Sequence, residues 1–213
     1  MSNYLRQNSV SNQTFFETHA KKGNIGLVGG SAFIDVSIRQ MQKKVTTDNN
    51  SSFWSHAFIV TGKREDDCIW MVESDLEFHK KQIKLGVQEA RIDKYFDETT
   101  YPNVALLDFN LDETQAKMLV AKALNLVALR TEYSIREVFG VLYSIVAQKS
   151  RLSENKLAQE NALFCSAMVQ KCFSAINFNL NTAINTKQLT PHDIYTTSLN
   201  FKGIEVVRAE SVF

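Results

Sequence analysis

Cysteine is scarce in this chain of 213 residues, which has three. Small domains held together by disulfides carry dense, even-numbered cysteines, so a disulfide scaffold is excluded and a reducing compartment is the simpler expectation. An excess of charge of one sign is also lacking, because the formal net charge is only +1. The composition therefore offers no electrostatic field for nucleic acid or for an anionic membrane.

Long apolar runs are missing as well. No stretch is long enough to span a bilayer, so we expect no transmembrane segment. The first residues, MSNYLRQNSVSNQTFFETHAKK, have no apolar core of the kind found in signal peptides. We therefore expect a protein that is cytoplasmic as synthesised, or that is exported by a route needing no such signal.

Several motifs of bound cofactors and metals are absent. The glycines of GNIGLVGG (23–30) fit neither the GxGxxG pattern nor the lysine-bearing phosphate loop. The histidines and cysteines show no CxxC or HxxxH spacing, which argues against a zinc site. No pair of carboxylates stands out for glycoside chemistry. We expect no cofactor and no metal.

Hydrophobic periodicity predicts an α+β fold, with short strands early and helices later. Residues 1–22 are expected to form a polar N-terminal arm that is mobile or loosely helical, and 23–213 a single domain. The segment 81–96 is expected to turn at Gly86. Strands are predicted within 23–30, 53–62, 68–74, 103–110 and 203–210, and helices within 31–44, 112–130, 134–149, 161–173 and 189–201.

The stretch NALFCSAMVQKCF (161–173) holds two of the three cysteines. Cys165 lies near the expected start of a helix, where unpaired N–H groups and the helix dipole stabilise a thiolate. From position alone, Cys165 is equally consistent with a small core residue. Cys172 lies two turns deeper and is expected to serve packing. Cys68 is expected in the core of a strand.

His56 is the histidine that differs from the other three, because it interrupts the apolar run FWSHAFIV. A buried imidazole needs polar partners, and a backbone partner in the core would satisfy it. However, the neighbouring strand CIWMVES ends its apolar run on Glu73. A carboxylate there either orients His56 across the hairpin or is an exposed charge at the strand end. A base held by a third group is the general signature of an activated nucleophile.

The ordered segments GNIGLVGG, WSHAFIV, MVES, LGVQEARIDKYF, FCSAMVQKCF and LTPHDIY resemble the circularly permuted branch of the NlpC-like, papain-fold cysteine peptidases. The resemblance spans roughly residues 23 to 195 and implies a papain-like antiparallel sheet packed against helices. It also implies that Cys165 is the nucleophile, His56 the general base and Glu73 the residue that orients the base. Asn24 and Ala167 stand where the family usually has acidic residues.

The resemblance implies a cysteine peptidase or amidase, with peptidoglycan stem peptides as its commonest substrates. An antibacterial effector, with an immunity protein and a secretion machine as partners, fits the expected lack of a signal peptide. A cytosolic enzyme of wall-peptide recycling fits as well. Two alternatives remain: a lipid-directed acyltransferase or thioesterase of the same fold, and a non-catalytic binding module in which Cys165, His56 and Glu73 do not touch. Segment 148–160 is either a lid or an idle loop.

Overall fold

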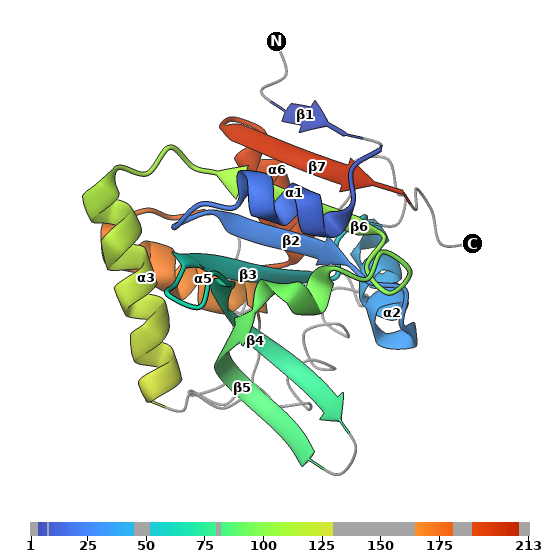
Figure 1. Cartoon of the computed structure of the whole chain (residues 1–213), viewed down its shortest axis with the longest axis horizontal. Helices are drawn as coiled ribbons and strands as arrows, with labels where there is room; N and C mark the ends of the chain where they lie inside the picture. The colour runs from blue at the N-terminus through green and yellow to red at the C-terminus, as the bar shows by residue number, and fades with distance from the viewer. Residues whose placement is uncertain are drawn as a thin grey trace.

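The computed structural model describes residues 4–7, 9–44, 52–79, 82–129, 165–180 and 189–208. Their strands form one seven-stranded sheet in the order β1-β7-β6-β2-β3-β4-β5 (Figure 1). All neighbouring strands are antiparallel except β1 and β7. The strands are β1 (Tyr4–Arg6), β2 (Ile25–Gly29), β3 (His56–Lys63), β4 (Ile69–His79), β5 (Gln82–Arg91), β6 (Asn103–Asp108) and β7 (Lys202–Val207).

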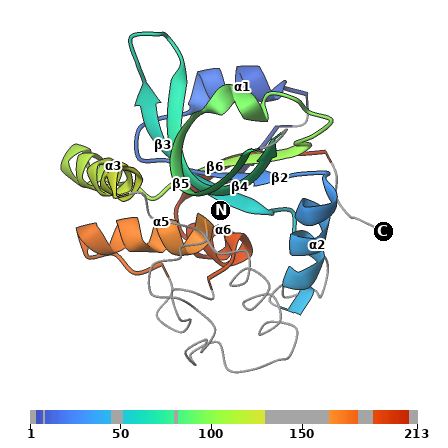
Figure 2. The ribbon, with the colours of Figure 1, turned by 90° about the horizontal axis from the view of Figure 1, so that it is seen from below.

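Helices cover both faces of the sheet. Helix α1 lies on one face, and α3, α5 and α6 lie on the other (Figure 2). A 3-10 turn, η2 (Ile92–Tyr95), follows β5 directly. The α-helices of the described residues are α1 (Asn12–His19), α2 (Phe33–Met41), α3 (Glu113–Ala128), α5 (Cys165–Phe173) and α6 (Pro191–Ser198). The predicted α+β class is thereby confirmed.

Strand β3 is apolar on both faces because both faces are covered. Ala57 and Ile59 belong to the core shared with α3 and α5, whereas Phe58 and Val60 belong to the core beneath α1. A strand buried on two sides reads as a continuous apolar run rather than an alternating one. His56, the first residue of this strand, therefore lies at the end of a run of five buried residues.

Helices α3 and α6 each begin at a reciprocal pair of capping residues. Asp112 and Gln115 form a reciprocal capping box at the start of α3, and Thr190 and Asp193 form one at the start of α6. Pro191 occupies the first turn of α6, where its missing N–H costs nothing. The predicted helices within 112–130 and 189–201 and the last strand are confirmed.

Two predictions about the chain path were wrong. Residues 1–22 contain the helical segment that was one of the two expectations, α1, but where the structure describes them they are not a loose arm, because β1 pairs with β7 and Phe15 and Phe16 of α1 are completely buried. The chain also does not turn at Gly86. Strand β5 runs straight through this residue, whose φ of 124° a glycine tolerates without steric cost while the pairing with β4 continues.

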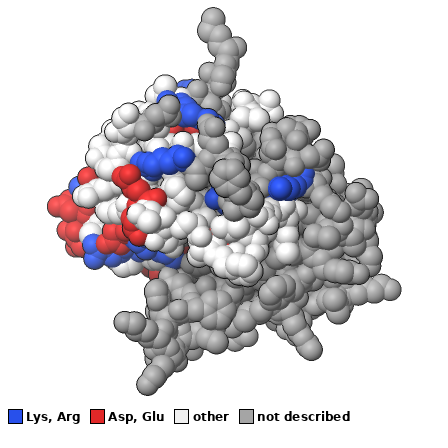
Figure 3. All heavy atoms as spheres, turned by 90° about the vertical axis from the view of Figure 1, so that its right-hand side faces the viewer, with Lys and Arg blue, Asp and Glu red and all other residues white. Residues whose placement is uncertain are grey.

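The predicted helix 134–149 and the segment 148–160 lie outside the described residues. Within the described ranges, no helix has the length and apolar character needed to cross a membrane. On the face drawn in Figure 3, the described acidic side chains gather mainly at the left edge next to several basic ones, and at least one basic side chain lies apart from them on the right.

Candidate active site

The hairpin of β3 and β4 brings His56 and Glu73 together. Glu73 pairs with Phe58 across the two strands, so its side chain is diagonal to that of His56 on the same face. The Nε2 atom of His56 lies 3.2 Å from Oε2 of Glu73. Glu73 is 0% exposed, which rules out the exposed strand-end charge. The predicted contact between these two residues is confirmed.

Two further donors contact the Glu73 carboxylate. The hydroxyl of Tyr95 donates to Oε2 at 2.6 Å, and the ammonium of Lys94 donates to Oε1 at 2.7 Å. Both residues belong to η2. A carboxylate removed from water needs such partners to remain charged. Neither residue was assigned a role from the sequence, where Glu73 was either the residue that orients His56 or an exposed strand-end charge. The first of these alternatives was itself a signal that donors to the carboxylate had to lie nearby.

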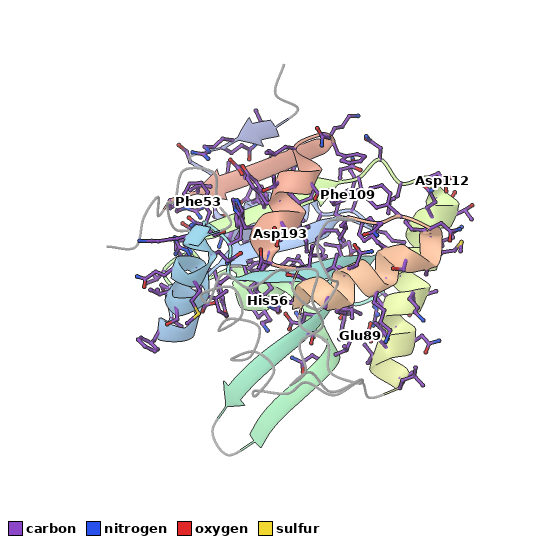
Figure 4. The ribbon with its side chains drawn as sticks, turned by 180° about the vertical axis from the view of Figure 1, so that it is seen from behind. Phe53, His56, Glu89, Phe109, Asp112 and Asp193 are labelled. Atoms are coloured by element: carbon purple, nitrogen blue, oxygen red, sulfur yellow. The ribbon has the colours of Figure 1, made fainter. Side chains whose placement is uncertain are left out.

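Helix α5 brings Cys165, its first residue, to the same place. The thiol is partly buried and is hydrogen-bonded to His56. Since Nε2 of the imidazole faces Glu73, Nδ1 is the nitrogen left for the thiol. Figure 4 shows His56 beside one end of α5. The structure thus connects Cys165, His56 and Glu73 in one chain of contacts. The non-catalytic alternative required these three residues to lie apart.

The thiol of Cys165 is stabilised in its ionised form. Burial alone would raise its pKa, but the charge and the hydrogen bond of His56 oppose that effect. The backbone N–H of Ala57 and the hydroxyl of Ser166 also favour the thiolate, and the net result is a pKa below that of an ordinary cysteine. A thiolate beside an imidazole is the form in which cysteine acts as a nucleophile.

Cys172 lies on the same helix and has the opposite environment. It is completely buried among apolar residues of the core, and this burial raises the pKa of its thiol to about 12. The predicted packing role agrees with that environment. Cys68 was wrongly placed in the core, because it is only partly buried and lies just before β4, where its thiol donates to the carbonyl of Asp66.

A network of polar contacts fixes the chain just before His56. The hydroxyl of Ser55 donates to Oδ1 of Asp35 at 2.7 Å and accepts the N–H of Gly30 at 3.1 Å. The buried guanidinium of Arg39 donates to the carbonyls of Ser52 and Gly30. These contacts tie α2 and the end of β2 to the start of β3, and so hold the backbone that carries His56.

Asn24, one of the departures from the family pattern, has a local role. Its side-chain oxygen accepts the N–H of Lys21 at 2.9 Å, which closes the turn between α1 and β2.

Among the described residues, no group of three or more histidine, cysteine and acidic side chains is arranged to hold a metal ion.

Comparisons with known proteins identify no family. No protein-family model and no curated protein matches the sequence. One similar solved structure is titled as the crystal structure of metalloprotein yiiX from Escherichia coli O157:H7, DUF1105. The two share 11% sequence identity at a TM-score of 0.49, over 82% of this chain and 91% of that one. A likeness of this degree carries no argument about function, which therefore depends on the residues of the site.

Proposed function

We propose that this protein is a cysteine hydrolase of papain-like, circularly permuted NlpC-type fold that cleaves amide bonds. The observation that carries the proposal is the thiol of Cys165, which has a lowered pKa and is hydrogen-bonded to His56, itself held by the buried Glu73. Nucleophile, base and orienting carboxylate are the three parts of an activated nucleophile. Peptidoglycan stem peptides are the substrate class that the sequence resemblance favours.

The reaction follows from this order of contacts. The thiolate sulfur of Cys165 attacks the carbonyl carbon and forms a tetrahedral intermediate. The C–N bond then breaks as the imidazolium of His56 gives its proton to the leaving amine, which leaves an acyl thioester on Cys165. Water, deprotonated by His56, attacks the thioester, and the acid product departs as the thiol is restored. Glu73 stabilises the imidazolium throughout.

The developing oxyanion needs a hydrogen-bond donor. The backbone N–H of Cys165 lies in the first turn of α5, where N–H groups have no partner within the helix. One such donor contributes on the order of 3 kcal/mol to transition-state stabilisation in other enzymes. Tyr133, which precedes the predicted helix 134–149 and is the candidate that the sequence offers for a second donor, lies outside the described residues.

The decisive experiment is the digestion of purified peptidoglycan, with the products identified by mass spectrometry. We expect cleavage by the wild-type protein, none by Cys165→Ala, and retained cleavage by Cys172→Ala, the matched control on the same helix. The mass of the products names the bond that is cut. If folded wild-type protein leaves peptidoglycan intact but hydrolyses long-chain acyl esters, the peptidase assignment fails in favour of the lipid-directed alternative.

A role as an antibacterial effector makes a separate prediction about the compartment of action. We expect expression directed to the periplasm of a Gram-negative host to cause lysis, and expression in the cytoplasm to be tolerated. Cys165→Ala should abolish the lysis without lowering protein abundance. Growth that is unaffected in both compartments, despite peptidoglycan cleavage by the purified protein, would favour the recycling role instead.

A further inference from the structure

The phenol of Tyr95 and the imidazole of His56 meet at one oxygen atom. The hydroxyl of Tyr95 donates to Oε2 of Glu73 at 2.6 Å, and Nε2 of His56 lies 3.2 Å from the same atom. Because Glu73 is completely buried, its charge is balanced by these protein groups rather than by bulk water. Tyr95 therefore contacts the carboxylate at the position from which the base is oriented.

Tyr95 is itself held firmly in place. Only 1% of the residue is exposed, and its ring stacks on Phe58 with the ring centres 5.1 Å apart. Its backbone carbonyl accepts the side-chain amide of Asn12 at 2.9 Å. The phenol hydroxyl is therefore pre-positioned by α1 and β3, two elements that lie outside the 3-10 turn carrying Tyr95.

Lys94 fixes the second oxygen of the same carboxylate. Its ammonium donates to Oε1 of Glu73 at 2.7 Å, and its side chain is only 21% exposed. Because Tyr95 donates to one oxygen and Lys94 to the other, both oxygens of the carboxylate are held from η2. Charge-assisted bonds of this kind are shorter and stronger than neutral ones.

We propose that Tyr95 is a positioning residue for the Cys165–His56 pair, acting through Glu73, and that Lys94 is its second support. The inference depends on the proposed function of Cys165 as the nucleophile. The effect of Tyr95 and Lys94 is on the carboxylate: without these donors a buried carboxyl group becomes protonated or rotates away, and a neutral or misplaced Glu73 no longer stabilises the imidazolium that accompanies the thiolate.

The test measures the reactivity of Cys165 with iodoacetamide as a function of pH, read separately for each cysteine by mass spectrometry. This measurement needs no substrate, so it does not depend on the identity of the scissile bond. In Tyr95→Phe, which keeps the ring and its stacking, we expect the apparent pKa of Cys165 to rise by about one unit. The alkylation rate at pH 6 should then fall about tenfold. Labelling of Cys68 serves as the internal reference and should not change.

Lys94→Gln should shift the pH profile of Cys165 alkylation in the same direction. Lys94→Arg, which keeps a charged donor, should give a smaller shift. Lys117→Gln is the matched control. Lys117 also forms a 2.7 Å ion pair, with Glu113, but both partners are largely exposed, so its removal should leave the Cys165 profile unchanged.

The possible failures are distinguishable. If Tyr95→Phe melts like the wild type and keeps the wild-type profile, or shifts it toward lower pH, the positioning role is overturned while the nucleophile stands. If Cys165 of the wild-type protein reacts with the pH dependence of an ordinary thiol, the proposed function fails and takes this inference with it.

Discussion

Cys165 and Cys172 lie on one helix, yet the structure gives their thiols opposite acidities. The pKa of Cys165 is lowered, chiefly because the charge and hydrogen bond of His56 overcome the effect of burial, whereas burial raises that of Cys172 to about 12. Two turns of helix separate a thiol that meets the sheet beside an imidazole from one enclosed by apolar side chains. The two cysteines can therefore be distinguished by the reactivity of their thiols.

Selective alkylation should reveal the difference directly. At pH 7 we expect iodoacetamide to modify Cys165 well before Cys172, because the thiolate is the reacting species and Cys172 is also inaccessible. Cys172 should react only after the protein is unfolded in urea. The labelled peptides can be quantified by mass spectrometry. Comparable labelling of the two residues in the native protein would contradict the environments described for them.

Cys172 should also make the protein less stable in alkaline solution. Well below pH 9, the ordinary pKa of a cysteine, the thiol is protonated in both the folded and the unfolded state and has no effect on stability. As the pH rises further, the unfolded chain releases this proton while the folded one retains it up to about pH 12, so unfolding is increasingly favoured. The loss should reach about 2 kcal/mol at pH 10.5.

Urea unfolding at several pH values measures this loss. Cys172→Ala should be less stable than the wild type at pH 7 because of the cavity it creates, but its free energy of unfolding should fall less between pH 8 and pH 10.5. Tyrosine and lysine titrate in both proteins, so the difference between the two slopes isolates the thiol. Parallel slopes would show that Cys172 ionises normally in the folded protein.

Asn12 should contribute strongly to stability although it lies in a polar stretch of sequence. Its buried amide donates to the carbonyls of Tyr95 and Tyr101, and its oxygen accepts from Arg208. Asn12→Ala leaves these groups without that partner and should cost about 3 kcal/mol of unfolding free energy. Gln13→Ala is the control: Gln13 is exposed and its amide contacts only Glu17 among the described contacts, so a change below about 0.5 kcal/mol is expected.

If Asn12→Ala unfolds with the wild-type midpoint in urea, α1 does not support η2 in the way described. The same variant should also slow the alkylation of Cys165, because the carbonyl that it releases belongs to Tyr95.

Gly26 should not tolerate a side chain. A Cβ atom at this position would overlap the ring of Phe58, which stacks on Tyr95. Gly26→Ala should destabilise the protein by about 2 kcal/mol through overpacking. A double-mutant cycle checks the cause: Phe58→Leu makes room for the methyl group, so the two changes together should cost less than their sum. Strict additivity, measured by urea unfolding, would mean that the clash is relieved elsewhere.

The part of the site that could be predicted from sequence is the part built from neighbouring strands. His56 and Glu73 lie on a hairpin whose turn and apolar strands can be recognised in the sequence. Their proximity therefore follows from the pairing of two neighbouring strands. The docking of Cys165 against them is tertiary, and it was expected from an ordered set of motifs rather than from periodicity. Lys94 and Tyr95 were missed because they contact Glu73 from η2, the turn that follows β5. The spacing of these residues in the sequence does not indicate this contact.

The errors in the fold have equally specific causes. Among the residues of α1, the large apolar side chains that are fully buried are Phe15 and Phe16. The rest of the segment is polar, so its average composition did not indicate that the helix packs on the sheet. Gly86 was expected to break the chain because glycine favours turns. In the structure its positive φ is accommodated within a strand that β4 pairs on both sides of it.

The order of His56, Glu73 and Cys165 in the sequence has a consequence for folding. The hairpin that carries His56 and Glu73 closes a short loop, and such local contacts form early at little entropic cost. Cys165 comes from a helix far downstream and packs on this hairpin only by closing a much longer loop. A ribosome-bound chain that has emerged only as far as β6 therefore holds His56 and Glu73 but not Cys165. The cysteine, when it follows, remains an ordinary thiol until α5 docks.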